Sequence, residues 1–143
     1  MDMDIKEINQ KVIRQFRAGG PVEGMRRERL LLLTTTGRKT GQLRTTPMMF
    51  DRDEEDLLVI ASNVGAPTHP DWYVNLAEDP HVVVEVGEDR FDAVASTISG
   101  DRRERLWTRL KRQYPFFADH EAKTDRTIPV VALTRVHDPS ASR

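Results

Sequence analysis

The sequence contains no cysteine, so disulfide bridges, thiolate metal sites and cysteine nucleophiles are excluded. It has no apolar run close to the roughly 20 residues that span a bilayer, so we expect no transmembrane segment. Acidic residues stand at the N-terminus, where a signal peptide would carry cations. Together these absences predict an intracellular, cytoplasmic protein.

The chain also has no excess of positive charge. Its formal net charge is −1, so we expect no nucleic-acid partner. The histidines show no metal-ligand spacing, and we expect no metal site. A length of 143 residues suits one hydrophobic core, and we predict a single domain over residues 1–143.

Positive charge is nevertheless concentrated in one segment. Residues 26–45 hold six cations and one acid, a net charge of +5. Within it, "TTTGRKTGQLRTTP" (34–47) places Arg38, Lys39 and Arg44 among six threonines and two glycines. An arginine can grip a phosphate or carboxylate with two parallel hydrogen bonds. The segment is therefore either a solvated glycine turn between strands or a site for an anion with several negative groups.

Hydrophobic patterning predicts a mainly β fold with peripheral helices. Apolar residues from Ile5 to Phe16 recur at spacings of three and four, which predicts an amphipathic helix within residues 1–20. We expect this helix to pack on the domain; a lid or peripheral membrane contact is the alternative. Further helices are expected at 70–79, from 101 to 114 and at 116–123.

Strands come mostly in neighbouring hairpins, which favours a small, mostly antiparallel barrel over residues 29–136. Pro47 cannot donate a ladder hydrogen bond, so its strand is expected at an edge or a bulge. Residues 137–143 read as a frayed tail. The expected strands are 29–35, 43–51, 56–62, 81–86, 90–98 and 128–136.

Three segments in order resemble the deazaflavin-dependent nitroreductase family of actinobacteria. They are "LLLLTTTGRKTGQLRTTPMMF", "LLVIASNVGAPTHPDWYVNLAEDPHVVVEV" and "YPFFADHEAKTDRTIPVVAL". The resemblance implies a split β-barrel of the FMN-binding type that holds coenzyme F420. The tail of this cofactor carries a phosphate and several glutamate carboxylates, which accounts for the cationic segment.

The resemblance also implies site residues. The phosphate and tail would be held by Arg38, Lys39, Thr40 and Arg44. The ring would lie near Thr45, Thr46, Pro47, Met48, Met49, Ile60, Ala61, Ser62 and Asn63. A further cofactor-binding segment would be Asp71, Trp72, Tyr73, Val74 and Asn75, and Phe117 would pack on the ring or the substrate.

Catalytic roles are expected for Tyr114, His120 and Ser62. Tyr114 could donate a hydrogen bond to the acceptor, and His120 could supply a proton because its unperturbed pKa is near 6.5. Phe117 cannot donate, which weakens the expectation of nitro-compound reduction. For Tyr114 and Phe117 the alternative is packing in the core.

The expected function is transfer of a hydride from reduced F420 to a small acceptor: a quinone, an enone or a nitro compound. A non-catalytic F420 carrier or storage protein is one alternative. An FMN-binding split-barrel oxidoreductase is another, although one phosphate needs fewer cations than are gathered here. The sequence leaves the oligomeric state open between monomer and homodimer.

Overall fold

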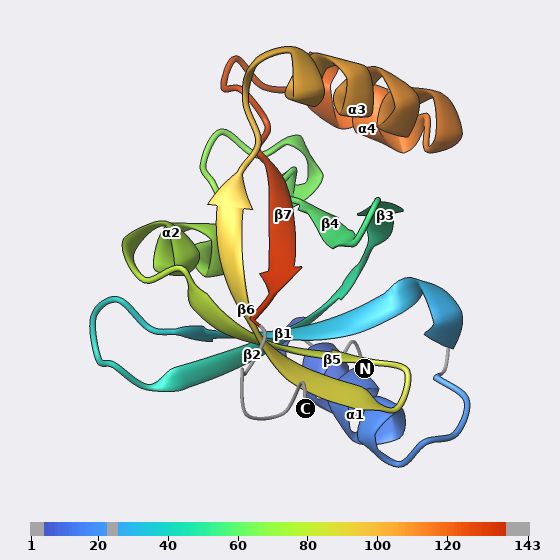
Figure 1. Cartoon of the computed structure of the whole chain (residues 1–143), viewed down its shortest axis with the longest axis vertical. Coiled ribbons are helices and arrows are strands. Elements are labelled where there is room, and N and C mark those ends of the chain that lie inside the picture. Colours follow the sequence, from blue (N-terminus) through green and yellow to red (C-terminus); the bar gives the residue numbers. More distant parts are fainter. Residues whose placement is uncertain (1–4, 23–25, 137–143) are drawn as a thin grey trace.

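A computed structural model describes residues 5–22 and 26–136 of the chain. The predicted tail, 137–143, lies outside this described part. The described residues form one seven-stranded sheet and four α-helices (Figure 1). In chain order the elements are α1 (Ile5–Arg17), β1 (Leu30–Thr36), β2 (Leu43–Met49), β3 (Asp51–Asp53), β4 (Asp56–Ile60), α2 (Asp71–Glu78), β5 (His81–Val86), β6 (Asp89–Thr97), α3 (Gly100–Gln113), α4 (Phe116–Ala122) and β7 (Val130–Arg135).

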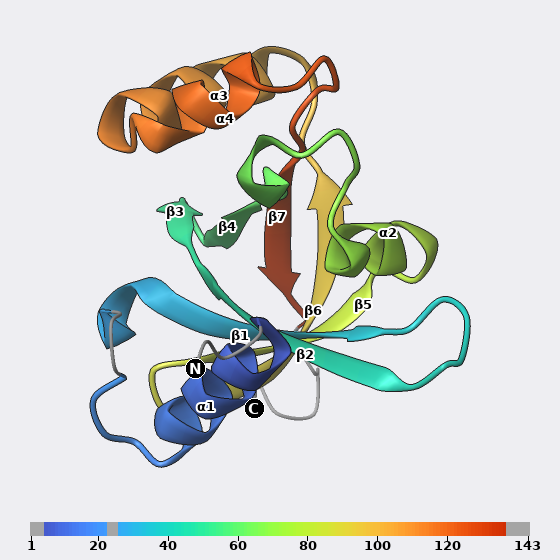
Figure 2. The ribbon, with the colours of Figure 1, turned by 180° about the vertical axis from the view of Figure 1, so that it is seen from behind.

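The sheet is curled into half a barrel. Its strand order is β2-β1-β5-β6-β7-β4-β3, and each neighbouring pair is antiparallel. The two edge strands, β2 and β3, are separated in the chain by Phe50 alone, so the sheet must bend until its edges meet. Figure 2 shows the chain passing directly between them. The mainly β, mostly antiparallel split-barrel prediction is confirmed.

Strand β1 has a continuous apolar run and is buried on both faces. Leu31 and Leu33 point into the central core, whereas Leu30 and Leu32 face helix α1. Because successive strand residues point to opposite faces, one short run can serve two cores. The apolar stripe of α1 packs on the second face through Val12 and Phe16, so its expected docking on the domain is confirmed.

The structure corrects the prediction of one strand over 43–51. Two strands form here, β2 and β3, and Phe50 lies between them with its backbone N–H donated to the carbonyl of Arg29. No strand was expected between 51 and 56, but Asp51–Asp53 pairs with β4. Pro47 does lie on an edge strand, as expected.

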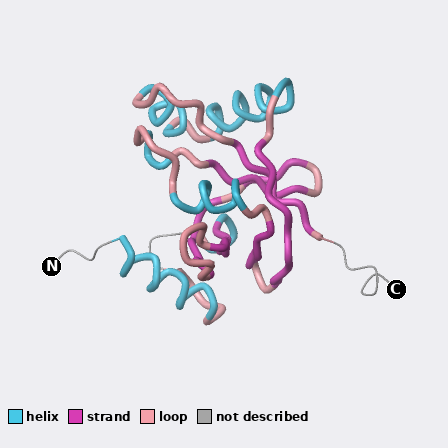
Figure 3. The backbone as a smooth tube through the Cα atoms, turned by 90° about the vertical axis from the view of Figure 1, so that its left-hand side faces the viewer, coloured by secondary structure: helices cyan, strands magenta, loops and turns pink. Residues whose placement is uncertain are grey.

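The helices lie at different ends of the half-barrel. Figure 3 shows α1 at one end and α3 with α4 at the other, while α2 covers the side between them (Figure 1). Glu121 ties α3 to α4, because its carboxylate accepts hydrogen bonds from the Trp107 indole at 2.5 Å and from Lys111 at 3.0 Å. Within the described residues, no helix is long and apolar enough to cross a membrane.

Candidate functional site

The cationic segment forms a tight hairpin between β1 and β2. The backbone N–H of Gly37 donates to the Gln42 carbonyl at 2.7 Å, and that of Gly41 donates to the Gly37 carbonyl at 2.8 Å. Gly41 has φ of +74°, a left-handed conformation that favours glycine. A side chain at position 37 would start 3.0 Å from the Gln42 carbonyl oxygen. The two glycines thus let the turn close and project its side chains outward.

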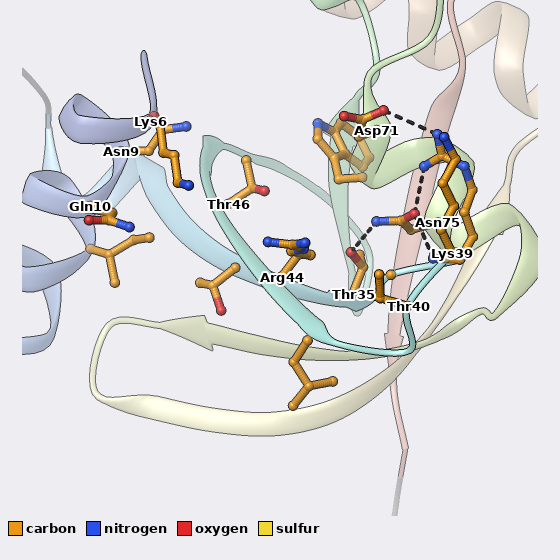
Figure 4. A pocket seen from close by; sticks show the side chains of 16 residues that line it. Lys6, Asn9, Gln10, Thr35, Lys39, Thr40, Arg44, Thr46, Asp71 and Asn75 are labelled. Carbon is orange, nitrogen blue, oxygen red and sulfur yellow. Dashed lines mark hydrogen bonds and ion pairs between the residues drawn. The ribbon is translucent and has the colours of Figure 1, made fainter. Parts of the chain in front are cut away.

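These side chains line an open cavity of about 760 Å³ between β1–β2, α2 and α1 (Figure 4). Nine of the residues expected at the cofactor lie on its wall. They are Arg38, Lys39, Thr40, Arg44, Thr45, Thr46, Asp71, Trp72 and Asn75.

Arg38 is held in place by α2. The Asn75 side-chain oxygen accepts hydrogen bonds from the Arg38 backbone N–H at 3.2 Å and from its guanidinium at 2.8 Å. Asp71 approaches the same guanidinium at 3.4 Å. Asn75 is buried and donates in turn to the Thr35 hydroxyl at 3.3 Å. The guanidinium is therefore oriented before any ligand arrives.

The other cations of the cavity have no protein partner. Within residues 5–22 and 26–136, no hydrogen bond or ion pair is formed by the side chains of Lys6, Lys39 and Arg44. All three are exposed at the cavity wall. Donors without an internal partner are available to an incoming anion.

Helix α1 contributes a wall that the sequence analysis missed. Lys6, Asn9, Gln10 and Ile13 line the cavity opposite α2 (Figure 4). Their spacing of three, one and three is a readable helix face. The spacing does not say which part of the protein that face meets, because this depends on how α1 docks.

The remaining cations of residues 26–45 do not all join the cavity. Arg27 donates to the carbonyls of Phe16 and Gly87, and its guanidinium lies 4.3 Å from the centre of the Phe16 ring. Arg29 donates to the Tyr114 hydroxyl. Both arginines fasten elements together, and neither lines the cavity.

A second polar centre forms where β4 ends. Ser62 is buried, and its hydroxyl lies 3.1 Å from Nδ1 of His120 on α4. Burial, and then the charge of Lys123, lower the pKa of His120. The structure thus brings together two of the three residues predicted as catalytic, with a neutral imidazole against a hydroxyl.

Arg126 holds this centre, and the sequence analysis gave it no role. Its guanidinium donates to the carbonyls of Ala61, Ser62 and Ala66 at 3.1, 2.6 and 2.9 Å. It also donates to Nδ1 of His69 at 3.0 Å, which places the proton of that neutral ring on Nε2. Burial, and then Arg126, lower the pKa of His69. The available signal was its place in "TDRTIPVVAL".

The loop that Arg126 grips is strained. Asn63 and Val64 have φ of 48° and 56°, and Gly65 follows with φ of 80°. A β-branched residue in the left-handed region is a true outlier. Val64 is also 70% exposed, so burial does not enforce its conformation. Strain of this kind clusters at functional sites, where the surroundings maintain it.

Tyr114, the third predicted catalytic residue, is bonded elsewhere. Its hydroxyl accepts from Arg29 at 2.7 Å and donates to Asp51 at 3.1 Å. Burial, and then the Asp51 carboxylate, raise its pKa. Phe117 is buried against Trp107 in the core under α3. These contacts match the packing alternative that the sequence left open for both residues.

The other residues expected at the cofactor lie outside the cavity wall. Tyr73 bonds Thr97 through its hydroxyl at 2.9 Å, and its ring lies 4.9 Å from that of His69. Asn63 donates to the Thr68 carbonyl. The remaining expected residues are half-buried, apart from the fully buried Ala61; they are Pro47, Met48, Met49, Ile60 and Val74.

No group of three or more histidine, aspartate or glutamate side chains is placed to hold a metal in the described part.

Comparisons with known proteins agree with this geometry. A family model described as F420H(2)-dependent quinone reductase matches residues 7–135. The F420H(2)-dependent quinone reductase Rv1261c of Mycobacterium tuberculosis is 40% identical over 108 residues, 73% of this chain and 72% of the relative.

Two solved structures are similar to this chain over most of its length. One named F420-H2 dependent reductase (FDR-A) is 37% identical, with a TM-score of 0.66 over 73% of this chain and 93% of that chain. Another, described as a domain-swapped dimer, is 32% identical, with a TM-score of 0.70 over 87% and 94% of the two chains. The resemblance seen in the sequence is confirmed, and the chain belongs to the F420H(2)-dependent quinone reductase family.

Proposed function

We propose that this protein binds reduced F420 and reduces a quinone. The observation that carries the proposal is the cavity of about 760 Å³, where an oriented Arg38 faces two unpaired cations, Lys39 and Arg44. When bound, reduced F420 supplies a hydride, and the protein has to hold its reactive carbon against the acceptor.

The donor set fits the anionic tail of this cofactor. A phosphate accepts well from a guanidinium, and Arg38 is pre-oriented by Asn75, so little side-chain entropy is lost on binding. Threonine hydroxyls at positions 40, 45 and 46 add neutral donors beside the cations. The carboxylates beyond a phosphate need separate cations, and Arg44 and Lys39 stand apart along the wall (Figure 4).

Ser62 and His120 are suited to deliver a proton. A quinone oxygen gains negative charge as hydride arrives, and a donor aimed at that oxygen stabilises the developing charge. With the proton of the neutral imidazole on Nδ1, His120 donates to the Ser62 oxygen, which leaves the hydroxyl proton free for the acceptor. Ser62 would then transfer its proton to the acceptor. His120 would return a proton to the serine oxygen from Nδ1 while Nε2 takes one up from solvent, so the imidazole stays neutral.

Parallel titrations with F420 and FMN test the proposal. The K39Q/R44Q variant should bind F420 at least about tenfold more weakly than the parent, because two charge-assisted contacts are lost. The R105Q/R112Q variant has the same net charge but alters exposed positions of α3, and it should bind like the parent. Equal affinity of K39Q/R44Q and the parent would reject the proposal, and preferential FMN binding would favour the flavin alternative.

Turnover separates an enzyme from a carrier. S62A and H120A should keep F420 affinity within about twofold, since neither residue lies on the cavity wall, and should slow quinone reduction by about a hundredfold or more. If the parent binds reduced F420 but reduces no quinone, enone or nitro compound, the protein is a carrier.

We also infer a cytoplasmic site of action without membrane anchoring by α1. The apolar residues Val12 and Phe16 are already buried against β1, and Ile8 is the one large apolar side chain exposed on the described part of the helix. Co-sedimentation with anionic lipid vesicles would contradict this inference.

A further inference from the structure

Helix α1 has two working faces. Val12 and Phe16 pack on Leu30 and Leu32 in the hydrophobic cluster beneath the sheet. A second face, formed by Lys6, Asn9, Gln10 and Ile13, lines the cationic cavity. We call this second face the α1 wall. Its first three side chains are polar. They are not needed to dock the helix, because the apolar stripe does that.

The α1 wall is fixed rather than loosely attached. At the far end of the helix, Arg17 makes a two-point contact with Glu85 on β5, at 3.0 and 2.9 Å. The guanidinium of Arg27 donates to the carbonyl of Phe16 and lies over its ring. Ile13 is itself half-buried in the cluster. The wall therefore presents its polar side chains to the cavity in a defined position.

The cations of the cavity are spread over both walls. Figure 4 shows Lys6 on the α1 side, Arg44 between the walls, and Lys39 near α2. A compact anion such as a single phosphate could contact the cations at only one end of the cavity. A chain with several negative groups could contact both ends at once. The amides of Asn9 and Gln10 can each donate and accept, which matches the amide groups that link such a chain.

We propose that the α1 wall binds the outer, carboxylate-bearing part of the F420 tail, with Lys6 on a glutamate carboxylate and the amides of Asn9 and Gln10 on the links. The inference rests on the proposed function, since it assigns part of the same cofactor to this helix. It makes affinity depend on tail length: forms with several glutamates reach Lys6, whereas a form with one glutamate does not.

Equilibrium titration, followed through the fluorescence of F420 itself, tests this without turnover. The parent, K6Q and R14Q are each titrated with F420 carrying one glutamate and with F420 carrying five or more. Arg14 lies on the same helix, is exposed and is not part of the cavity wall, so R14Q matches the charge change. Lysine, arginine and glutamine have similar helix propensities.

We expect K6Q to weaken binding of the long-tailed form roughly two- to fivefold, the range for an exposed ion pair, and to leave the short-tailed form unchanged. K6E should weaken long-tailed binding further, and R14Q should change neither form. If K6Q has the affinity of the parent for both forms, or loses the same factor of affinity for both, the α1 wall does not bind the outer part of the tail. Strong binding of both forms by the parent would still support the proposed function, so the two failures are distinguishable.

Discussion

At the scale of single residues, Arg126 holds the Ser62 loop in its conformation, although it lies in a connection between a helix and a strand. One guanidinium satisfies three backbone carbonyls and the imidazole of His69, all within the segment from 61 to 69. A lysine keeps the positive charge but is a compact donor on a flexible stem and cannot match this planar fork. The conformation of the Ser62 loop therefore depends on the shape of Arg126 as well as on its charge.

The R126K variant tests this dependence. We expect its free energy of unfolding to fall by about 2–4 kcal/mol, because at least two buried carbonyl oxygens lose their partner. R105K is the control, since Arg105 is exposed and its side chain forms no hydrogen bond or ion pair within the described part of the chain. Urea denaturation of both variants gives the comparison. A loss in R126K no larger than that in R105K would show that the loop holds its shape without this fork.

Arg126 also shows where residue-level prediction fails. An arginine between a helix and a strand is usually a solvated surface charge, and the one signal to the contrary was its place in the family-like segment "TDRTIPVVAL". Arg38, Lys39 and Arg44 were singled out because they gather in one glycine turn, where the composition allowed an anion site and the family resemblance favoured it. Lys6 was missed for the opposite reason, since it reaches the same cavity from a part of the chain that only docking brings near.

At the scale of elements, the Ser62 loop and α4 are fitted closely together. A Cβ at position 65 would lie 2.8 Å from the His120 carbonyl oxygen and 2.9 Å from the Lys123 Cβ. Both distances are below normal contact, and one neighbour is backbone that cannot rotate away. The glycine thus allows α4 to bring His120 to Ser62.

Replacing Gly65 with alanine should push α4 off the loop. We expect G65A to lose about 2–4 kcal/mol of stability, from left-handed backbone strain and from the collision together. Gly87 is a matched control, because its φ is +57° and a Cβ there would meet nothing within 4 Å. G87A should therefore show the strain alone, about 1–2 kcal/mol.

Thermal unfolding and quinone turnover should be measured for both glycine variants. G65A should also lose turnover, because His120 would leave hydrogen-bonding distance of Ser62, whereas G87A should not. Equal losses of stability in the two variants would mean that α4 can shift away from the new methyl group without cost. The contact between the loop and α4 would then not set the geometry of the Ser62–His120 pair.

Most elements could be predicted because their residues carry local signals. Alternating or continuous apolar runs bounded by glycine and acidic turns gave β1, β4, β5, β6 and β7 within a few residues. Strand β3 was missed because Asp51–Asp53 is too polar to read as a strand, and its pairing with β4 is what makes it one.

At the scale of the whole molecule, the curled sheet explains how distant segments share a site. The edges meet at Phe50, which brings the start of β1, the start of β3 and the end of α3 together around Tyr114. The hairpins were readable from the sequence, but the closure was not, because no local pattern encodes which edges approach. The same closure places the Tyr114 hydroxyl between Arg29 and Asp51, and its role as a catalytic donor stays a prediction.

The whole fold should also be sensitive to mild acid. In the native state the pKa values of His69 and His120 are both lowered, chiefly by burial, whereas in the unfolded chain they return to about 6.5. Below that pH the unfolded state binds more protons than the native state, so stability falls as the pH decreases from about 6.5 toward the native pKa values. Above about 6.5 both states are neutral at these positions and the stability is fully present.

The melting temperature of the parent should therefore be lower at pH 5.5 than at pH 7.5. H69N/H120N should show a smaller drop, because an asparagine amide can occupy the hydrogen-bonding position of Nδ1 at both sites without titrating. H81N, which changes a histidine whose side chain is 80% exposed, should keep the drop of the parent. If the parent and H69N/H120N lose the same number of degrees, the acid sensitivity originates elsewhere. The Ser62–His120 pair would then be free to charge at little cost, and the neutral imidazole on which the proton transfer depends would lose its physical basis.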